Sequence, residues 1–309
     1  MPDPCARALL ATVLAIGASL SAFAPVAWGD AAARDPGTGT TGGAPATLAL
    51  DGVADPDAGD TAFRWSLEAT WMYGPIDGQL QTPTGGMPGT TTVGRPTLEE
   101  LGLDYASIFA AEATFGAGPH EFFFYTQLNR LYGDTTLEDT FMSQGRTFPA
   151  GSRVHSDVKL DLYRLGYRHR IAAGYRRDGG PQFFLYPSAG IAIFAFDMHL
   201  DGANGAYVDR PYAKGAPEVG LGFEWLATEQ LTVTGELTST LDLSKLPLVV
   251  TAKIEGKYVL VRSRGVTVSG TVGVGYQLIR YDDAHKQEMP NDIEIDLGPV
   301  VLLGIDVRF

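Results

Sequence analysis

Residues 62–73 of the chain read AFRWSLEATWMY, and apolar and polar side chains alternate along them. The apolar positions of this segment are Phe63, Trp65, Leu67, Ala69, Trp71 and Tyr73. The polar positions between them are Arg64, Ser66, Glu68 and Thr70. Successive side chains of a β-strand point to opposite faces, so the segment predicts a strand with one apolar, aromatic face and one polar face.

The same alternation recurs to the end of the 309-residue chain and predicts about ten strands, within a range of eight to twelve. They are expected at residues 62–73, 105–115, 120–131, 154–171, 183–196, 217–225, 231–241, 250–261, 266–278 and 297–309. The segment 183–196 is apolar on both faces, and the second half of 154–171 loses the alternation, which a β-bulge would explain. Abundant glycine (38 residues) and proline (19) also favour many strands and turns over long helices.

Short and long connections alternate between these strands. Short turns are expected at 116–119, 227–230 and 263–265, and long loops at 75–104, 133–153, 197–212 and 280–295. The connection 242–247 is short and breaks the rule. Short turns at one end and long loops at the other are typical of outer-membrane barrels.

The N-terminus has the features of a secretory signal. Arg7 precedes an apolar stretch at 8–24, and the sequence Ala27-Trp28-Gly29 places small residues at −3 and −1 of a cleavage site. This predicts a signal peptide over residues 1–29, with an uncleaved anchor helix as the alternative. Residues 30–61 are rich in Ala, Gly, Thr, Pro and Asp without a period, which predicts a flexible periplasmic linker. The only cysteine, Cys5, lies in the proposed signal, so the mature chain would hold no disulfide.

The faces of residues 62–309 fit a transmembrane, antiparallel up-and-down β-barrel. Such a barrel turns the apolar face to lipid, whereas a soluble sandwich, the alternative, buries it between two sheets. The polar faces carry few long charged side chains, and the apolar faces are bulky and aromatic on nearly every strand. Aromatic side chains near strand ends are expected to form girdles at the two membrane interfaces: Trp65, Trp71, Tyr73, Tyr105, Trp225, Tyr258, Tyr276 and Tyr281.

The last strand ends in an alternation of Leu303, Ile305, Val307 and a terminal Phe309. This resembles the C-terminal targeting signature of Gram-negative outer-membrane β-barrel proteins, and the architecture resembles their small OmpA-like and OmpW-like members. The resemblance implies an outer-membrane location and recognition of Ile305, Val307 and Phe309 by the barrel assembly machinery, after transit with periplasmic chaperones. It also implies closure of the last strand against the first, contact with lipid and lipopolysaccharide, and a monomer. The catalytic acidic and His–Asp pairs of the ten-stranded omptin proteases do not map onto this chain.

Charged residues of the polar faces are expected to face the barrel interior. They are Arg64, Glu68, Glu112, Lys159, Asp161, Glu218, Glu224, Glu236, Lys253, Glu255, Lys257, Asp306 and Arg308. They predict either the lining of a narrow pore or a plug of ion pairs, since unpaired charges in a confined interior are costly.

Other polar groups give weaker hypotheses. His155 and Asp157 would share a strand face while Ser156 points away, so no nucleophile-to-base relay forms between His155 and Ser156. An acidic loop offers oxygen ligands for divalent cations that would bridge lipopolysaccharide phosphates, and one histidine in it could act as a base or ligand; its members are Asp282, Asp283, His285, Glu288, Asp292 and Glu294. Thr97 and Glu100 fit a capping box, with Gly102 as the stop of a short helix at the barrel mouth.

The net charge of −13 argues against binding to nucleic acid. No catalytic set, metal site or cofactor is predicted. The leading hypothesis is therefore a non-enzymatic, porin-like or structural outer-membrane barrel. The alternatives are a surface hydrolase acting on lipid or peptide, and an adhesin that acts through the long loops.

Overall fold

The computed structural model describes residues 63–81, 96–143, 145–175, 181–243, 246–263, 265–282 and 292–309. All of them belong to one compact unit, Leu50–Phe309. The proposed signal peptide and linker lie outside the described residues. Among the residues described, no helix is long and apolar enough to cross a membrane.

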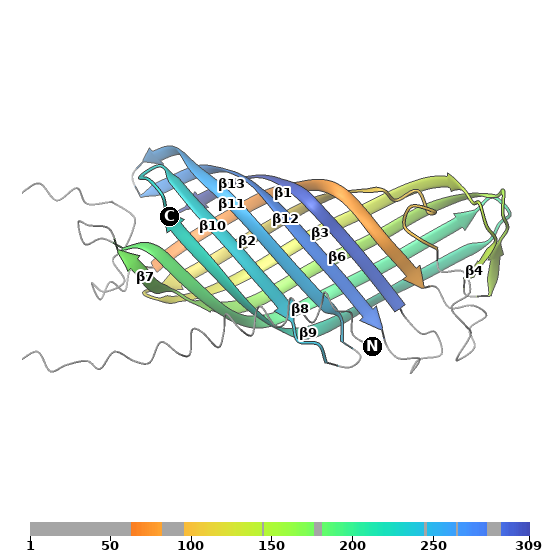
Figure 1. Ribbon diagram of the computed structural model, residues 1–309, viewed down its shortest axis with the longest axis horizontal. Coiled ribbons are helices and arrows are strands. Elements are labelled where there is room, and N and C mark those ends of the chain that lie inside the picture. Colours follow the sequence, from red (N-terminus) through yellow and green to blue (C-terminus); the bar gives the residue numbers. More distant parts are fainter. Residues whose placement is uncertain are drawn as a thin grey trace, which may run out of the picture. The chain divides into compact units, whose positions relative to one another are not determined.

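Ten long strands form the unit (Figure 1). They are β1 (Phe63–Gln81), β2 (Tyr105–Ala117), β3 (His120–Thr136), β6 (Arg153–His169), β8 (Pro181–Gly202), β9 (Tyr207–Leu226), β10 (Leu231–Thr240), β11 (Leu248–Ser263), β12 (Val266–Asp282) and β13 (Asp292–Arg308). Three short strands accompany them: β4 (Phe141–Ser143), β5 (Arg146–Phe148) and β7 (Ile171–Tyr175). The break between β6 and β7 falls where the alternation fails in the sequence.

The sheet closes on itself. Each long strand pairs antiparallel with its neighbours along the chain, β13 pairs with β1, and β6 pairs with β8 across the short β7. Leu67 lies opposite Val307 where the last strand meets the first. Closure confirms the up-and-down barrel and the pairing of the last strand with the first, and it rules out the sandwich.

The connections confirm the predicted division into short turns and long loops at most positions and correct it at one. The residues 118–119 and 227–230 are short turns, and β4 and β5 form a small hairpin inside the long connection after β3. The long loop expected at 197–212 was wrong, because β8 continues to Gly202 and β9 begins at Tyr207. Asp197 and His199 are therefore strand residues.

A belt of apolar side chains faces outward near the end with the short turns. Trp65 of β1 is 55% exposed and Leu303 of β13 is 47% exposed. On each of these strands, the side chains that alternate with the exposed ones point inward. The belt spans residues 63–73 of β1, close to the ~9–11 residues that a tilted strand needs to cross a bilayer. The predicted girdle aromatics face outward with one exception. Tyr281 is 1% exposed and points into the barrel, because β12 continues to Asp282 and its alternation places Tyr281 on the face opposite that of Tyr276.

Beyond this belt the two faces of the strands exchange polarity. The inward positions of β1 change from Arg64 and Glu68 to Met72 and Ile76, while the outward positions change from aromatic residues to Asp77. β6 and β13 show the same exchange. The outer part of the barrel is thus built like a water-soluble protein, with apolar side chains inside and polar ones outside.

The outer half of the interior holds an apolar core. Its members with the least exposure include Leu131, Val154, Val158, Leu160, Phe194, Met198, Leu200 and Ile295. The connection after β1 folds into this core, since Leu98 and Leu101 are completely buried. Thr97 and Glu100 form the predicted capping box, with the Glu100 amide donating to Thr97 Oγ1 at 3.1 Å and the Thr97 amide to Glu100 Oε2 at 2.8 Å. They cap a single turn, not the short helix expected.

We expect the apolar core to contribute more to stability than equal side chains of the belt. Leu160→Ala should lower the free energy of unfolding by about 2–5 kcal/mol, because it leaves a cavity. The matched control Leu165→Ala, on the same strand but 63% exposed, should cost clearly less, since lipid fills the space. Urea unfolding in lipid vesicles measures both; equal losses would show that the interior is loosely packed.

Candidate functional site

A charged cavity of ≈ 190 Å³ lies inside the barrel near the end with the short turns. Most of the lumen charges predicted from the sequence line it: Arg64, Glu68, Glu112, Glu224, Glu236, Lys253, Glu255, Lys257, Asp306 and Arg308. Glu218 is also buried inside the barrel, against Arg164. These side chains therefore lie inside the barrel, as the period-two pattern predicted, and their role as a pore lining or a plug stays a prediction.

Lys159 and Asp161 were assigned to the wrong face. They lie on the outward face of β6, where Lys159 donates to Asp197 of β8 at 2.8 Å. The apolar residues between them, Leu160 and Leu162, are 1% exposed and face the interior. The physical reason is the exchange of polarity: this part of β6 stands above the belt, so its polar face meets water outside the barrel.

The sequence reasoning missed three arginines that organise the interior: Arg164, Arg168 and Arg170. They were overlooked because the alternation was followed from the outer half of β6, where the inward face is apolar. The signal that could have found them is the run Arg164, Gly166, Arg168 between outward Leu165 and Tyr167.

Glycine at position 166 makes room for an aromatic ring over these arginines. A Cβ there would lie 2.6 Å from Cζ of Phe123. The guanidinium of Arg168 lies over the same ring, 4.4 Å from its centroid. The ring and the cation therefore stack where a larger residue would collide.

Ion pairs join strands that are not neighbours in the sheet. Arg164 Nε lies 2.8 and 2.9 Å from the two carboxylate oxygens of Glu218, and its Nη2 donates to Glu236 of β10 at 2.9 Å. Lys257 of β11 donates to Glu68 of β1 at 2.6 Å. These contacts cross the interior, since β8 and β9 separate β6 from β10, and β12 and β13 separate β11 from β1.

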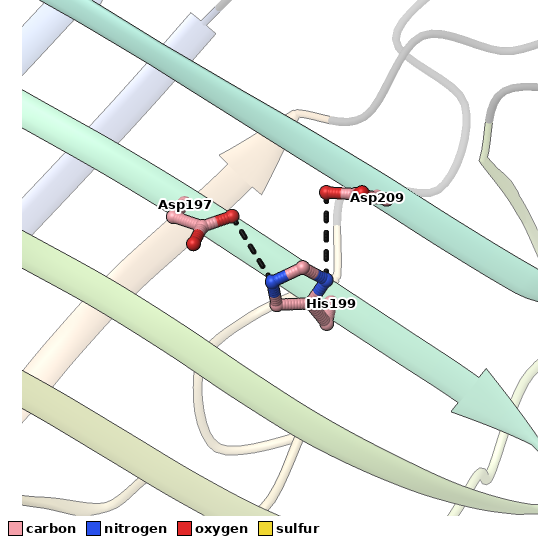
Figure 2. A group of neighbouring side chains, drawn as sticks. All are labelled: Asp197, His199 and Asp209. Atoms are coloured by element: carbon pink, nitrogen blue, oxygen red, sulfur yellow. Dashed lines mark ion pairs between the residues drawn. The ribbon is translucent and has the colours of Figure 1, made fainter.

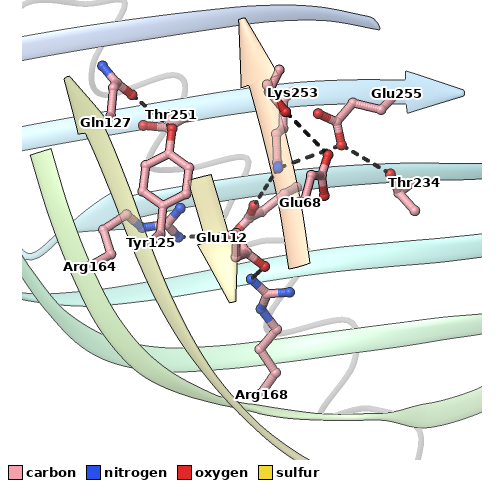
Figure 3. A network of polar contacts seen from close by, with 12 residues as sticks. Glu68, Glu112, Tyr125, Gln127, Arg164, Arg168, Thr234, Thr251, Lys253 and Glu255 are labelled. Carbon is pink, nitrogen blue, oxygen red and sulfur yellow. Dashed lines mark hydrogen bonds and ion pairs between the residues drawn. The ribbon is translucent and has the colours of Figure 1, made fainter. Parts of the chain in front are cut away.

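Further pairs complete the network, part of which is drawn in Figure 3. Arg168 pairs with Glu112 and Glu121, Arg170 with Glu224, and Arg308 with Glu224 and Asp306. Lys253 lies 3.7 Å from Glu236 and 3.6 Å from Glu255. Burying so many charges is tolerable because nearly every one has an opposite partner.

Two layers lie above the charged layer. In the first, Tyr125 donates to Gln127, and Gln127 of β3 donates to Gln277 of β12 at 2.9 Å across the interior. In the second, Tyr212 of β9 and Tyr281 of β12 have ring centroids 5.5 Å apart. The interior is therefore bridged at the charged, the amide and the aromatic level.

The remaining predicted groups lie on the outside or beyond the described residues. Val307 is partly exposed at the belt, and Ile305 and Phe309 are 53% and 54% exposed there. His155 faces outward, 3.6 Å from Asp134, whereas the Ser156 side chain is buried inside, as the alternation predicted. From the acidic loop, Asp283, His285 and Glu288 lie outside the described residues, while Asp282, Asp292 and Glu294 belong to strands.

The closed barrel with an outward apolar belt and an inward charged layer decides the class. The protein is a closed, ten-stranded antiparallel β-barrel with the outward apolar belt of a transmembrane barrel. No family model and no curated protein matches the chain.

Solved structures give distant matches. They include the attachment invasion locus protein Ail of Yersinia pestis (9% identity, 80% of this chain and 99% of that chain, TM-score 0.37). They also include the outer membrane protease OmpT of Escherichia coli (8%, 80% and 96%, TM-score 0.38) and the outer membrane protein OprG of Pseudomonas aeruginosa (11%, 81% and 98%, TM-score 0.32). At such values none of them assigns a role to a residue of this barrel.

We expect the removal of Arg164 alone to destabilise the barrel more than the removal of its charge together with those of Glu218 and Glu236. Arg164→Ala leaves the carboxylates of Glu218 and Glu236 buried without their partner, and should lower the free energy of unfolding by about 3–5 kcal/mol. Adding Glu218→Gln and Glu236→Gln should restore part of the loss. Arg153→Ala is the control, because its pair with Asp134 is exposed and should contribute under about 1 kcal/mol. Denaturant unfolding in vesicles that shows equal, small losses for both arginines would contradict a stabilising network.

Proposed function

We propose that this protein is a non-enzymatic outer-membrane barrel with a closed interior, which serves a structural or surface role and is not an open pore. The observation that carries the proposal is the apolar core that fills the outer half of the barrel. Hydrated solutes do not pass a layer of buried apolar side chains without displacing it.

The contacts across the interior support the same reading. Ion pairs, the Gln127–Gln277 hydrogen bond and the Tyr212–Tyr281 contact each join strands that are not neighbours in the sheet. A pore for small solutes would need charged groups that face water along a continuous path. Here the charges face each other in one layer, and the next layers outward are amide, aromatic and aliphatic.

The surface role is favoured by a further observation, because the barrel wall continues past the belt. Strands β8 and β9 have 22 and 20 residues, roughly twice what a bilayer needs. Their outer parts carry polar residues on the outward face, where a partner or lipopolysaccharide could bind. An enzymatic role for His155 and Asp157 stays a hypothesis; its test is whether their replacement abolishes a measured hydrolysis.

The test of the closed interior is conductance. We expect the refolded barrel to give no discrete, reproducible channel steps in planar bilayers. A variant that replaces the interior aromatics with alanine (Phe194, Phe196, Tyr212 and Tyr281) should give measurable steps, because it removes the aromatic layer of the apolar core.

An absence of conductance is informative only if controls show that the protein has folded and inserted into the bilayer. A heat-modifiable band in gel electrophoresis shows that each variant is folded, and a known porin shows that the bilayer accepts barrels. Stable conductance of the unaltered protein would overturn the closed-barrel proposal and direct attention to the lumen charges as a selectivity filter.

A further inference from the structure

Ionisable side chains gather on the outward wall of β6, β8 and β9, above the apolar belt. Ile191 and Ile193 of β8 are 55% and 43% exposed as part of the belt, and the next outward positions along the strand include Asp197 and His199. In the strand register His199 lies opposite Asp209 of β9 and opposite Asp157 of β6. One imidazole is therefore surrounded by carboxylates from its own strand and from both neighbouring strands.

The side-chain geometry is close (Figure 2). His199 Nε2 lies 3.1 Å from Asp197 Oδ1, and His199 Nδ1 lies 3.4 Å from Asp209 Oδ1. One ligand atom from each of the three residues lies within 4.8 Å of the others. Ligands around a tetrahedral ion at ~2.1 Å are separated by roughly 3.4 Å. The two aspartates contact different ring nitrogens, so an ion bound at one nitrogen requires the imidazole to turn and the other carboxylate to move toward it.

The hydrogen bonding of the carboxylates beside His199 is a second observation that favours a bound cation. Lys159 donates to Asp197 Oδ2 at 2.8 Å, which leaves Oδ1 turned toward the imidazole. Asp197 Oδ1 makes no hydrogen bond and has only its ion pair with His199, and Asp157 Oδ1 is a buried atom without a hydrogen-bond partner. Such buried acceptors are uncommon, and that of Asp157 lies on the residue opposite His199 in the β6–β8 register.

The hydrogen bond from Lys159 Nζ to Asp197 Oδ2 also orients the Asp197 carboxylate. An outer residue that fixes a ligand in this way is common at metal sites.

We propose that Asp197, His199 and Asp209 form a binding site for a divalent transition-metal ion, of which Zn²⁺ is the best-fitting example. One imidazole nitrogen with carboxylate oxygens is a ligand set suited to zinc, whereas calcium and magnesium prefer oxygen alone. The site lies on the outside of the barrel and is independent of whether the interior conducts.

The test is zinc binding to the folded barrel in detergent, prepared without a histidine tag and without chelator. Isothermal titration with ZnCl₂ should show one equivalent bound, and Asp209→Asn and His199→Ala should each weaken it at least tenfold. His155→Ala is the matched control, because it removes a neighbouring outward histidine that pairs with Asp134. His120→Ala tests the other close histidine pair, His120 and His169, whose rings lie 5.4 Å apart.

Each outcome decides the proposal, provided that heat-modifiability shows the variants to be folded. Loss of binding in His199→Ala and Asp209→Asn, with binding kept in His155→Ala and His120→Ala, supports the site. Absence of stoichiometric zinc binding in the unaltered protein overturns it and leaves a histidine ion-paired between two aspartates. Loss through His120→Ala, or binding of Mg²⁺ that His199→Ala leaves unchanged, would equally overturn it.

Discussion

The constraint on which this structure depends is the hydrocarbon layer around part of each strand. Because every second side chain there must be apolar and face outward, the side chains between them must face inward, whatever their polarity. In this chain they include many arginines, lysines and glutamates. A narrow interior holds such groups only if they pair, and the pairs are indeed made across the interior between strands that are not neighbours, β6 with β10 and β11 with β1.

These pairs act differently from backbone ladders. A ladder fixes a strand to its neighbours, whereas Lys257–Glu68 and Arg164–Glu236 fix the cross-section of the barrel. Each arginine also provides several donors in a planar group, so Arg164 bonds Glu218 and Glu236 at the same time. Cross-links of this kind make the lower interior rigid. Together with the packed core above, they leave the barrel little freedom to open.

Much of the fold could be predicted from the sequence, because period-two alternation is a direct record of the two faces. It located the long strands and most of the interior charges, including Glu68, Glu112 and Lys257. The alternation did not show that, beyond the membrane, the inward side chains become apolar and the outward ones polar. Its period is the same whether the polar side chains face the lumen or the water outside.

The same ambiguity explains why Lys159 and Asp161 were put inside. Residues 197–212 were read as a loop because polar residues are frequent where the wall meets water. Tyr281 was put in a girdle because its strand was expected to end at residue 278, whereas β12 continues to Asp282 and Tyr281 takes an inward position. Arg164 and Arg168 were missed because they lie on the membrane side of this change in polarity, where the inward face of β6 becomes charged. Contacts between strands far apart in sequence, such as Gln127 with Gln277, leave no local pattern at all.

The exchange of faces also determines where chemistry is accessible. Inside, charged groups neutralise one another or lie beneath an apolar layer, so ligands have little to bind without disrupting the barrel. Outside and above the belt, the polar faces of β6, β8 and β9 meet water on a rigid sheet whose register fixes the spacing of neighbouring side chains. His199 lies opposite Asp209 there for the same reason that Leu67 lies opposite Val307 in the belt. A rigid sheet that positions lipid-facing side chains below the interface positions ligand groups above it, so the outer wall is the part of this barrel best suited to specific binding.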